Sequence, residues 1–128
     1  MRALLDTHAL LWWLADDSVL TRAARKIIAD TKNTLVVSAA SAWEIATKVR
    51  LGKLPTAASL TADFTGCLDR ERFQLLSISV EHALRAGLLP GSHRDPFDRM
   101  LIAQAQAENL PIVSKEAIFD AYGLRRIW

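Results

Sequence analysis

The sequence predicts an α/β fold, a three-layer α/β/α sandwich with a central, mostly parallel sheet. Short apolar segments of strand length alternate along the chain with longer segments of helical period. Strands separated by helices pair in parallel through right-handed crossovers, which place helices on the faces of the sheet. The sequence shows no internal repeat, linker or low-complexity stretch, so we expect residues 1–128 to form a single domain.

Short apolar or β-branched segments mark the predicted strands. The first lies within RALLDTH and delivers Asp6 at its carboxyl end, where open α/β sheets bind ligands. Such continuous apolar runs are typical of strands buried on both faces of a parallel sheet. The other strands are predicted at residues 34–38, 74–78, 110–114 and 126–128.

Residues that start or end helices bound the predicted helices. Pro96 fits a first helical turn with Asp95 as its N-cap, and Gly52 and Gly123 fit helix ends. Apolar residues at helical spacing fill the segments between these signals. The predicted helices cover residues 8–17, 18–33, 38–52, 56–73, 80–93 and 95–109, and the tail from residue 115 adds one or two helical turns.

The composition favours a cytoplasmic protein without a membrane segment. The net charge is only +2, which permits an acidic partner without requiring one. The single cysteine, Cys67, cannot form an internal disulfide and is expected to be a small apolar residue in a reducing compartment. Because Asp6 interrupts the first apolar run, we expect neither a signal peptide nor a membrane span.

Acidic residues gather where the predicted strands end. Asp6 follows the first strand, Glu44 lies on the helix after the second, and Glu116 follows the fourth. Asp95 and Asp98 open the helix before the fourth strand and would face the same edge. Each acid has an ordinary structural explanation by itself, as a helix cap or as an exposed i,i+4 ion pair. Together, four or five carboxylates with few bases nearby repel one another and are costly to bury.

A divalent metal ion would compensate such a cluster. Carboxylate ligands without His or Cys suit Mg²⁺ or Mn²⁺ rather than zinc. Because Mg²⁺ held by carboxylates commonly also binds substrate phosphates, the cluster points to a phosphodiester or phosphate ester substrate. In a two-metal arrangement, one ion would generate the attacking hydroxide and the other would stabilise the leaving 3′-oxygen, which is nuclease chemistry. No P-loop or G-x-G-x-x-G motif supports nucleotide binding instead.

Four sequence blocks resemble PIN-domain proteins, specifically the VapC-type toxins of bacterial VapBC toxin–antitoxin pairs. The blocks are LLDTHALLWWL, SAASAWEIATKVRLGKL, HRDPFDRMLIAQA and IVSKEAIFDAYGLRRIW, in the family's order and spacing. The resemblance implies an α/β/α fold and a Mg²⁺- or Mn²⁺-dependent endoribonuclease that hydrolyses RNA phosphodiester bonds. It also implies a homodimer that is silenced by a VapB-type antitoxin, whose C-terminal segment occludes the acidic pocket.

The resemblance assigns roles to individual residues. Asp6, Glu44 and Asp98 match the family's catalytic, metal-binding acids. Asp95 belongs to the same DPFD block as Asp98 and is expected to bind the metal directly or through water. The fourth family acid is commonly an Asp in a Thr/Ser-x-Asp turn, and here Glu116 takes that position as a predicted catalytic residue, which leaves a second metal site open. Small polar positions near the pocket are matched by Thr7 and Ser38.

Several roles near the acids have alternatives. His8 and His93 flank the acids, either as a general base or as packed or capping residues. Arg94 and Arg99 are expected either to hold RNA phosphates or to neutralise the acids in the absence of metal. Because Glu116 replaces the usual Asp, a catalytically inactive PIN-like module that binds RNA or protein is an alternative function. A metal-dependent phosphatase acting on small phosphoesters is a third.

The tryptophans indicate a protein interface. Four occur in this short chain, and tryptophan is enriched where proteins bind one another. We expect an apolar groove between the first two helices and the AASAWEI helix, including Trp12 and Trp43, to accept an amphipathic antitoxin segment. The alternative is that both tryptophans belong to the hydrophobic core.

Overall fold

The computed structural model describes residues 1–128 and contains one sheet of five strands in the order β3-β2-β1-β4-β5. All four neighbouring pairs of strands are parallel, which confirms the predicted fold class. The strands are β1 Arg2–Leu5, β2 Thr34–Ser38, β3 Gln74–Leu76, β4 Ile112–Val113 and β5 Arg126–Ile127.

The central strand β1 marks the point where the direction of strand addition reverses. Leu5 of β1 lies opposite Val37 of β2 on one side and opposite Val113 of β4 on the other. The chain first adds β2 and β3 and later returns to add β4 and β5 on the opposite side. Such a reversal opens a crevice outside the carboxyl ends of the two strands, here β1 and β4.

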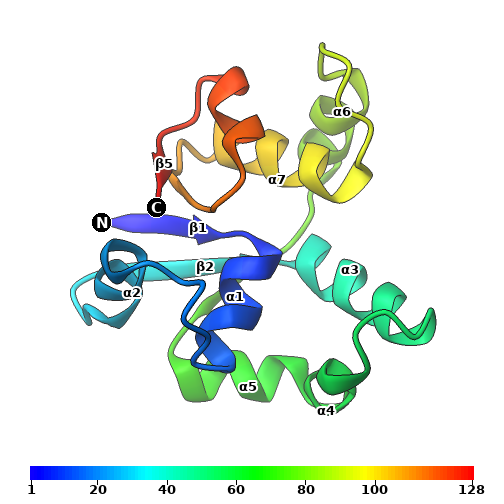
Figure 1. The fold of residues 1–128 in the computed structure, drawn as a ribbon. Coiled ribbons are helices and arrows are strands. Elements are labelled where there is room, and N and C mark those ends of the chain that lie inside the picture. The colour runs from blue at the N-terminus through cyan, green and yellow to red at the C-terminus, as the bar shows by residue number, and fades with distance from the viewer.

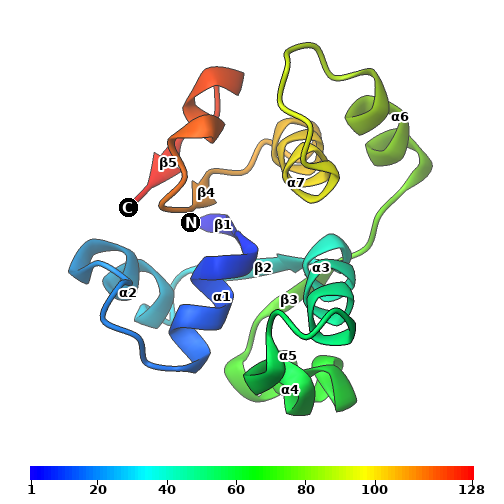
Figure 2. The same cartoon turned by 45° about the vertical axis from the view of Figure 1, so that its right-hand side comes forward.

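Helices cover both faces of this sheet. Figure 1 and the rotated view in Figure 2 show α1, α2 and α5 on one side and α6, α7 and the C-terminal helical turns on the other. None of the helices combines the length and the hydrophobicity that crossing a membrane requires. The helices are α1 Thr7–Leu14, α2 Arg22–Ala29, α3 Ala39–Arg50, η1 Pro55–Ala57, α4 Ala58–Ala62, α5 Phe64–Glu71, α6 Val80–Leu88, α7 Pro96–Ala107 and η2 Ala117–Tyr122, where η denotes a 3-10 helix.

The sheet separates two hydrophobic clusters. Leu5 packs with residues of α1, α2 and α5, whereas its neighbour Leu4 packs with residues of α7 and η2. Successive side chains of a strand point to opposite faces, so the apolar run of β1 feeds both clusters. The helix α3 lies at the boundary, because Ile45 belongs to the first cluster and Ala40 to the second.

Capping side chains set the starts of the helices that carry the acids. Asp6 caps α1, Ser38 caps α3 and Asp95 caps α7, each by accepting a hydrogen bond from a backbone amide of the first turn. Pro96 occupies the start of α7, as predicted. Each cap stabilises its helix by roughly 0.5–2 kcal/mol and fixes the residue from which the helix is counted.

The predicted helix over residues 56–73 is divided in the structure. Asp63 interrupts it with φ of −147° and ψ of 61°, and its carboxylate accepts a hydrogen bond from the Gly66 amide. Asp side chains that bond nearby amides compete with helix continuation and favour a new helix start. The prediction of one continuous helix is therefore wrong, and this part of the chain forms η1, α4 and α5.

Other predicted elements are shorter than expected. The second helix begins at Arg22 rather than at residue 18, because Thr21 caps it. The strand predicted at residues 74–78 ends at Leu76, which pairs with Ser38 at the end of β2. Similarly, β4 ends at Val113, opposite the last residue of β1. A strand stops where its neighbour no longer offers hydrogen-bonding partners, and this limit is set by the sheet rather than by local sequence.

A buried polar network joins α3, α6 and α7. The Ser38 hydroxyl lies 2.5 Å from Gln104 Oε1, and the Gln104 amide donates to the Ser77 carbonyl at 3.3 Å and lies 3.4 Å from His82 Nδ1. His82 Nε2 lies 2.9 Å from Glu108 Oε1. No buried side-chain nitrogen or oxygen lacks a partner, so the network adds directional contacts to the apolar core without an unsatisfied group.

Candidate functional site

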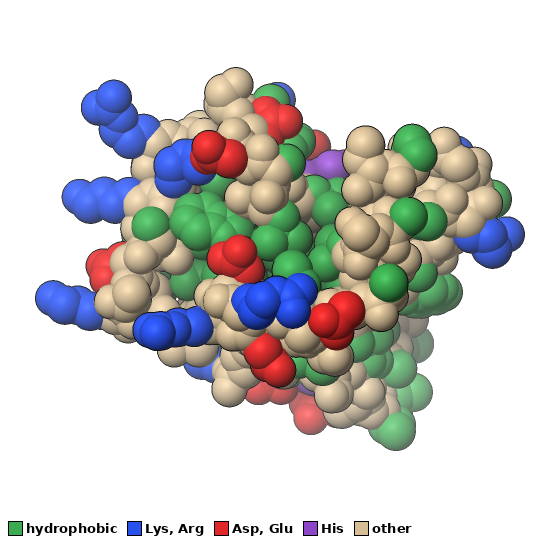
Figure 3. All heavy atoms as spheres, turned by 90° about the horizontal axis from the view of Figure 1, so that it is seen from below, with side chains coloured by type: hydrophobic (Ala, Val, Ile, Leu, Met, Phe, Trp, Pro, Cys, Tyr) green, Lys and Arg blue, Asp and Glu red, His purple; other side chains and the backbone are tan.

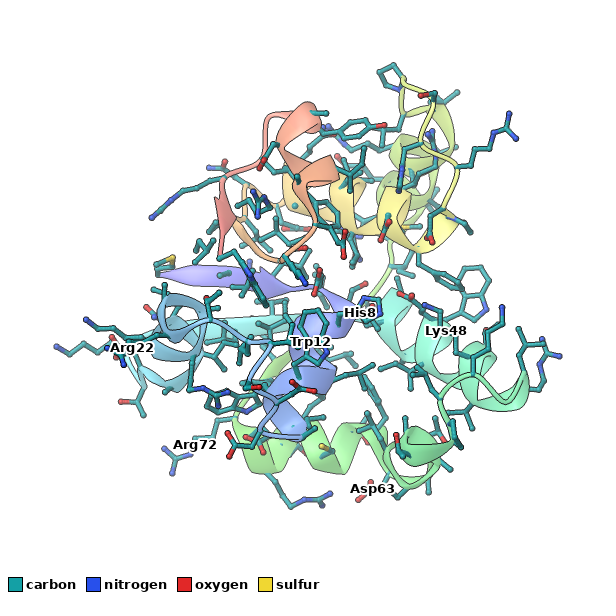
Figure 4. The ribbon with its side chains drawn as sticks, viewed as in Figure 1. His8, Trp12, Arg22, Lys48, Asp63 and Arg72 are labelled. Carbon is teal, nitrogen blue, oxygen red and sulfur yellow. The ribbon has the colours of Figure 1, made fainter.

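A pocket of about 250 Å³ lies at the carboxyl ends of the strands. All five acids singled out in the sequence line it, together with two histidines and a lysine. Figure 4 shows two of its residues, His8 at the start of α1 and Lys48 on α3. The lining residues are Asp6, Thr7, His8, Glu44, Lys48, His93, Asp95, Asp98, Glu116 and Ile118.

Asp6 is almost completely enclosed, with 4% of the residue exposed. Burial raises the pKa of its carboxyl group from 3.8 to about 6, and the charge of Asp98 acts in the same direction. Three neighbours lower this pKa. The Ser114 hydroxyl and the Ala9 amide donate hydrogen bonds to the carboxylate, and His8 acts on it through its charge. Desolvation prevails, so ionised Asp6 is costly in this site and an additional cation would stabilise it.

Glu44 is buried as well, with 5% of the residue exposed. Its Oε2 accepts a hydrogen bond from Lys48 Nζ at 2.5 Å. The Lys48 side chain is 31% exposed, so it reaches the carboxylate from the solvent side of the pocket. The i,i+4 ion pair considered from the sequence therefore exists, but it lies within the acidic pocket rather than on a solvated helix face.

Asp98 is half-buried on the first turn of α7. Its Oδ2 lies 2.8 Å from His93 Nε2. Burial raises the pKa of Asp98, the hydrogen bond with His93 lowers it, and the charges of Asp95 and Glu44 raise it. Asp95 itself is exposed and uses Oδ1 to cap the helix. The carboxylate of Glu44 on α3 is thus close enough to raise the pKa of Asp98 on α7.

The turn after β4 brings the fourth predicted acid to the pocket rim. Glu116 is exposed, and its backbone amide donates to the Ser114 hydroxyl at 2.9 Å. The same hydroxyl bonds to Asp6, which links the turn to the innermost acid. Arg126 donates to the Ser114 carbonyl and is itself held by both carboxylate oxygens of Asp120. The position of this turn is therefore fixed, whereas the Glu116 side chain stays accessible to solvent.

Asp6, Glu44 and Asp98, the inner acids of the pocket, offer the oxygen ligands that a hard divalent cation prefers. They are not, however, arranged as a ligand cluster. No group of three His, Cys, Asp or Glu side chains is arranged to hold a metal ion. Oxygen ligands and raised carboxyl pKa values nevertheless favour an added positive charge of the Mg²⁺ or Mn²⁺ type. Each inner carboxylate has its own protein partner: a backbone amide for Asp6, Lys48 for Glu44 and His93 for Asp98.

Arg99 does not line the pocket and pairs with none of its acids, so its predicted neutralising role is wrong, while its contact with RNA phosphates stays a prediction. Its guanidinium donates to the backbone carbonyls of Ala86 and Leu89 at the end of α6 and to that of His93. A helix leaves its last carbonyls without partners, and a guanidinium with five donors satisfies several of them at once. Arg99 therefore caps the C-terminal end of α6 and holds the loop that carries His93 against it. Arg94 is exposed and does not line the pocket, so its contact with RNA stays a prediction.

Polar residues near the pocket divide into two groups. Thr7 lines the pocket, and its hydroxyl lies 2.9 Å from that of Ser41, which ties α1 to α3. Ser38, expected near the pocket, instead caps α3 and does not line it. His8 lines the pocket and stacks on Trp12, with ring centroids 5.5 Å apart.

The part of the site that the sequence did not reveal is Lys48. Its spacing of four from Glu44 was visible, but its place in the pocket depends on the burial of Glu44, which the local pattern does not show.

An apolar groove of about 640 Å³ lies next to the acidic pocket, and His8 lines both. The helix α1 forms one side, and the segment from Leu54 to Arg70 forms the other. Figure 3 views the molecule from below, the side of α4 and α5, where hydrophobic side chains show between acidic and basic ones. The apolar lining residues are Leu11, Trp12, Leu14, Ala15, Leu54, Ala57, Leu60 and Cys67.

The predicted groove is only partly right. Trp12 lines the groove, but Trp43 does not, and neither α2 nor α3 contributes a lining residue. Trp43 is 57% exposed and packs edge-on against Phe97, with ring centroids 4.8 Å apart. Consecutive helix residues point about 100° apart, so when Glu44 faces the pocket its neighbour Trp43 must face elsewhere.

The raised pKa of Asp6 predicts a pH-dependent stability. Between about pH 4 and pH 6 the folded chain holds a proton on Asp6 that the unfolded chain has released, so this residue makes stability fall as pH rises through that window. Asp6→Asn removes the effect. In metal-free buffer, urea unfolding should show the variant gaining up to about 3 kcal/mol relative to wild type between pH 4 and pH 7. A difference between the two proteins that does not change with pH would contradict the assignment.

Comparison with known proteins identifies relatives by sequence. The pattern of the PIN domain family matches residues 3–124. One segment is 55% identical over 42 residues to Ribonuclease VapC16 of Mycobacterium tuberculosis. That segment amounts to 33% of this chain and to 28% of the relative's length.

Comparison of folds gives neighbours that align along nearly the whole chain. VapBC2 from Rickettsia felis, solved bound to a DNA fragment from its promoter, aligns over 100% of both chains with a TM-score of 0.69 and 17% identity. VapBC-1 from nontypeable Haemophilus influenzae aligns over 98% of this chain and 96% of the other, with a TM-score of 0.64 and 17% identity. The family match over residues 3–124 and this shared fold agree, and the chain belongs to the PIN domain family.

Proposed function

We propose that the chain is a metal-dependent endoribonuclease, the toxin of a VapBC-type toxin–antitoxin pair acting in the cytoplasm. The observation that carries the proposal is the convergence of Asp6, Glu44 and Asp98, from three separate segments, on one pocket at the carboxyl edge of the sheet. Lys48 pairs with Glu44 and His93 with Asp98, and His8 lies near Asp6, so five carboxylates share the pocket with one lysine and two histidines. The excess negative charge supports the binding of Mg²⁺ or Mn²⁺.

The relatives support the same choice of reaction and of partner. The 42-residue segment with 55% identity matches a protein named a ribonuclease, and the two fold neighbours described above are named VapBC proteins. A nuclease also accounts for an open, acidic pocket better than a small-phosphoester phosphatase does. The pocket has an exposed rim that a polymer can approach.

The pocket residues divide the work of phosphodiester hydrolysis. Asp6, Glu44 and Asp98 would hold the metal ion, with Asp95 at the edge of the ligand set. A divalent cation held by these residues would stabilise the negative charge on the phosphodiester oxygens. Glu116 is exposed at the rim, where its carboxylate can accept a hydrogen bond from the attacking water.

Removing the charge of an inner acid tests the proposal. Asp6→Asn and Asp98→Asn should each lower cleavage of cellular RNA by at least about a hundredfold in Mg²⁺ or Mn²⁺, because even outer contacts of a metal site are worth 10–100-fold. The measurement is the appearance of new RNA ends with purified, antitoxin-free protein. Asp69→Asn, which removes an exposed carboxylate of α5, is the matched control and should cleave like wild type.

Two outcomes would count against this function. Cleavage by Asp98→Asn at the wild-type rate would contradict the proposal that Asp98 helps to hold the metal ion. Absence of metal-dependent, EDTA-sensitive cuts by folded wild-type protein would favour the alternative of a catalytically inactive PIN-like module that binds RNA or protein.

We further propose that the apolar groove beside α1 binds an amphipathic segment of a VapB-type antitoxin. The groove is concave and mostly apolar, which suits the apolar face of a helix. Because His8 lines both the groove and the acidic pocket, a segment seated in the groove can continue toward the acids. Occlusion of the acids would then silence the nuclease.

A charge placed in the groove should weaken this complex. Leu60→Glu puts a carboxylate among apolar lining residues and should raise the dissociation constant for the antitoxin about thirtyfold or more, the size of an interface hot spot. Isothermal titration calorimetry with the antitoxin from the native host measures it, and thermal unfolding checks the fold. Wild-type affinity in a folded Leu60→Glu variant would place the antitoxin elsewhere.

We also propose that α6 mediates the homodimer. Val80, Leu84 and Leu88 repeat every four residues and are 77%, 61% and 83% exposed. A second copy packed antiparallel about a two-fold axis near Leu84 would cover this stripe. The same arrangement brings Glu81 of one copy within reach of Arg85 of the other, so the stripe is self-complementary in charge.

Leu84→Glu should therefore shift the chain from dimer to monomer. The substitution places one carboxylate of each copy at the two-fold axis, where the two charges repel. Light scattering coupled to size-exclusion chromatography measures the mass. Leu60→Glu in the groove serves as the control and should leave the dimer intact, and a dimeric Leu84→Glu variant would exclude this face.

A further inference from the structure

Lys48 is the one lysine or arginine among the residues that line the acidic pocket. Its Nζ lies 2.5 Å from Glu44 Oε2, and the Glu44 side chain is only 6% exposed. Both residues line the pocket with Asp6 and Asp98. The ammonium group therefore already neutralises one of the carboxylates that a divalent cation would need.

The acids are not arranged as a ligand cluster while this ion pair is in place. No three acidic or histidine side chains stand ready to hold a metal ion, and Glu44 is turned to Lys48 as Asp98 is to His93. A carboxylate engaged by a lysine has fewer oxygen lone pairs available to a metal. A metal ion that binds Glu44 through Oε2 therefore has to displace the ammonium.

The Lys48 side chain is able to leave. It is 31% exposed, and its flexible four-carbon stem starts on α3, one turn from Glu44. An ammonium that swings outward is fully hydrated, whereas Glu44 has almost no contact with solvent. The pair thus joins a buried carboxylate to a counter-ion that is partly exposed.

We propose that Lys48 is a tethered counter-cation that occupies Glu44 in the metal-free site and exchanges with the divalent ion. The proposal rests on the proposed function only in that the acids bind a divalent cation. Because the lysine is attached to the same helix, it competes at a high local concentration and weakens metal binding. Lys48 is in this sense a positioning residue: it holds the buried carboxylate until the metal arrives.

Metal titration without RNA tests the exchange. Isothermal titration of the antitoxin-free chain with MnCl₂ should give Lys48→Met a dissociation constant about tenfold lower than that of wild type, since a charge-assisted hydrogen bond no longer has to be broken. Lys48→Arg keeps a competing cation and should bind Mn²⁺ like wild type. Thermal unfolding without metal checks that each variant is folded.

A matched variant separates competition from net charge. Arg50→Met removes one positive charge from the same helix at an exposed position outside the pocket. It should change Mn²⁺ affinity much less than Lys48→Met does. Equal tightening by the two variants, or no tightening by Lys48→Met, overturns the exchange even if wild type binds Mn²⁺.

The titrations also distinguish this proposal from the proposed function. Binding by Lys48→Met where wild type binds weakly or not at all supports the exchange. Failure of both proteins to bind Mn²⁺ overturns the exchange together with the metal site.

A measurement on wild type avoids the variants altogether. In a sample with ¹⁵N-labelled lysine, saturation with Mg²⁺ should move the side-chain resonance of Lys48 to the position of a hydrated lysine, while that of Lys53 stays in place. An unchanged Lys48 resonance at saturating Mg²⁺ would show that the ion pair persists and would overturn the exchange.

Discussion

The burial of like charges at one edge of the sheet is the constraint on which the pocket depends. Asp6 and Glu44 are almost fully buried, and Asp98 lies near enough to raise the pKa of Asp6. The fold stabilises each charge separately, with a backbone amide and a serine hydroxyl at Asp6, Lys48 at Glu44 and a histidine at Asp98. These contacts replace water only partly, which is why burial still raises the pKa of Asp6.

The scaffold holds these charges together through contacts that are not themselves acidic. Asp6 follows the central strand, and the hydroxyl of Ser114 links it to the turn that carries Glu116. The network of Ser38, Gln104 and His82 connects the helix of Glu44 to the helix of Asp98. Rigid placement matters because a carboxylate cluster is useful for catalysis only when its members cannot move apart to relieve their repulsion.

The acidic pocket and the apolar groove form one continuous functional surface. His8 lines both, and its ring stacks on that of Trp12. The ring centroids of Trp12 and Trp128 are in turn 5.7 Å apart. A partner bound in the groove would thereby be adjacent to the acids of the pocket without needing contacts inside it. The exposed stripe on α6 lies on the opposite side of the sheet, so the proposed dimer interface and the proposed antitoxin groove are separate surfaces.

The sequence by itself determined the parallel α/β class, the order of the elements and the acids that meet at the strand ends. These follow from apolar periodicity and helix caps such as Asp95, which act over a few residues. Only the tertiary structure decided the lengths of β3 and β4, the break at Asp63, the burial of Glu44 with Lys48 and the turning of Trp43 away from the groove. Those features depend on which distant segments pack together, and local pattern carries no such information.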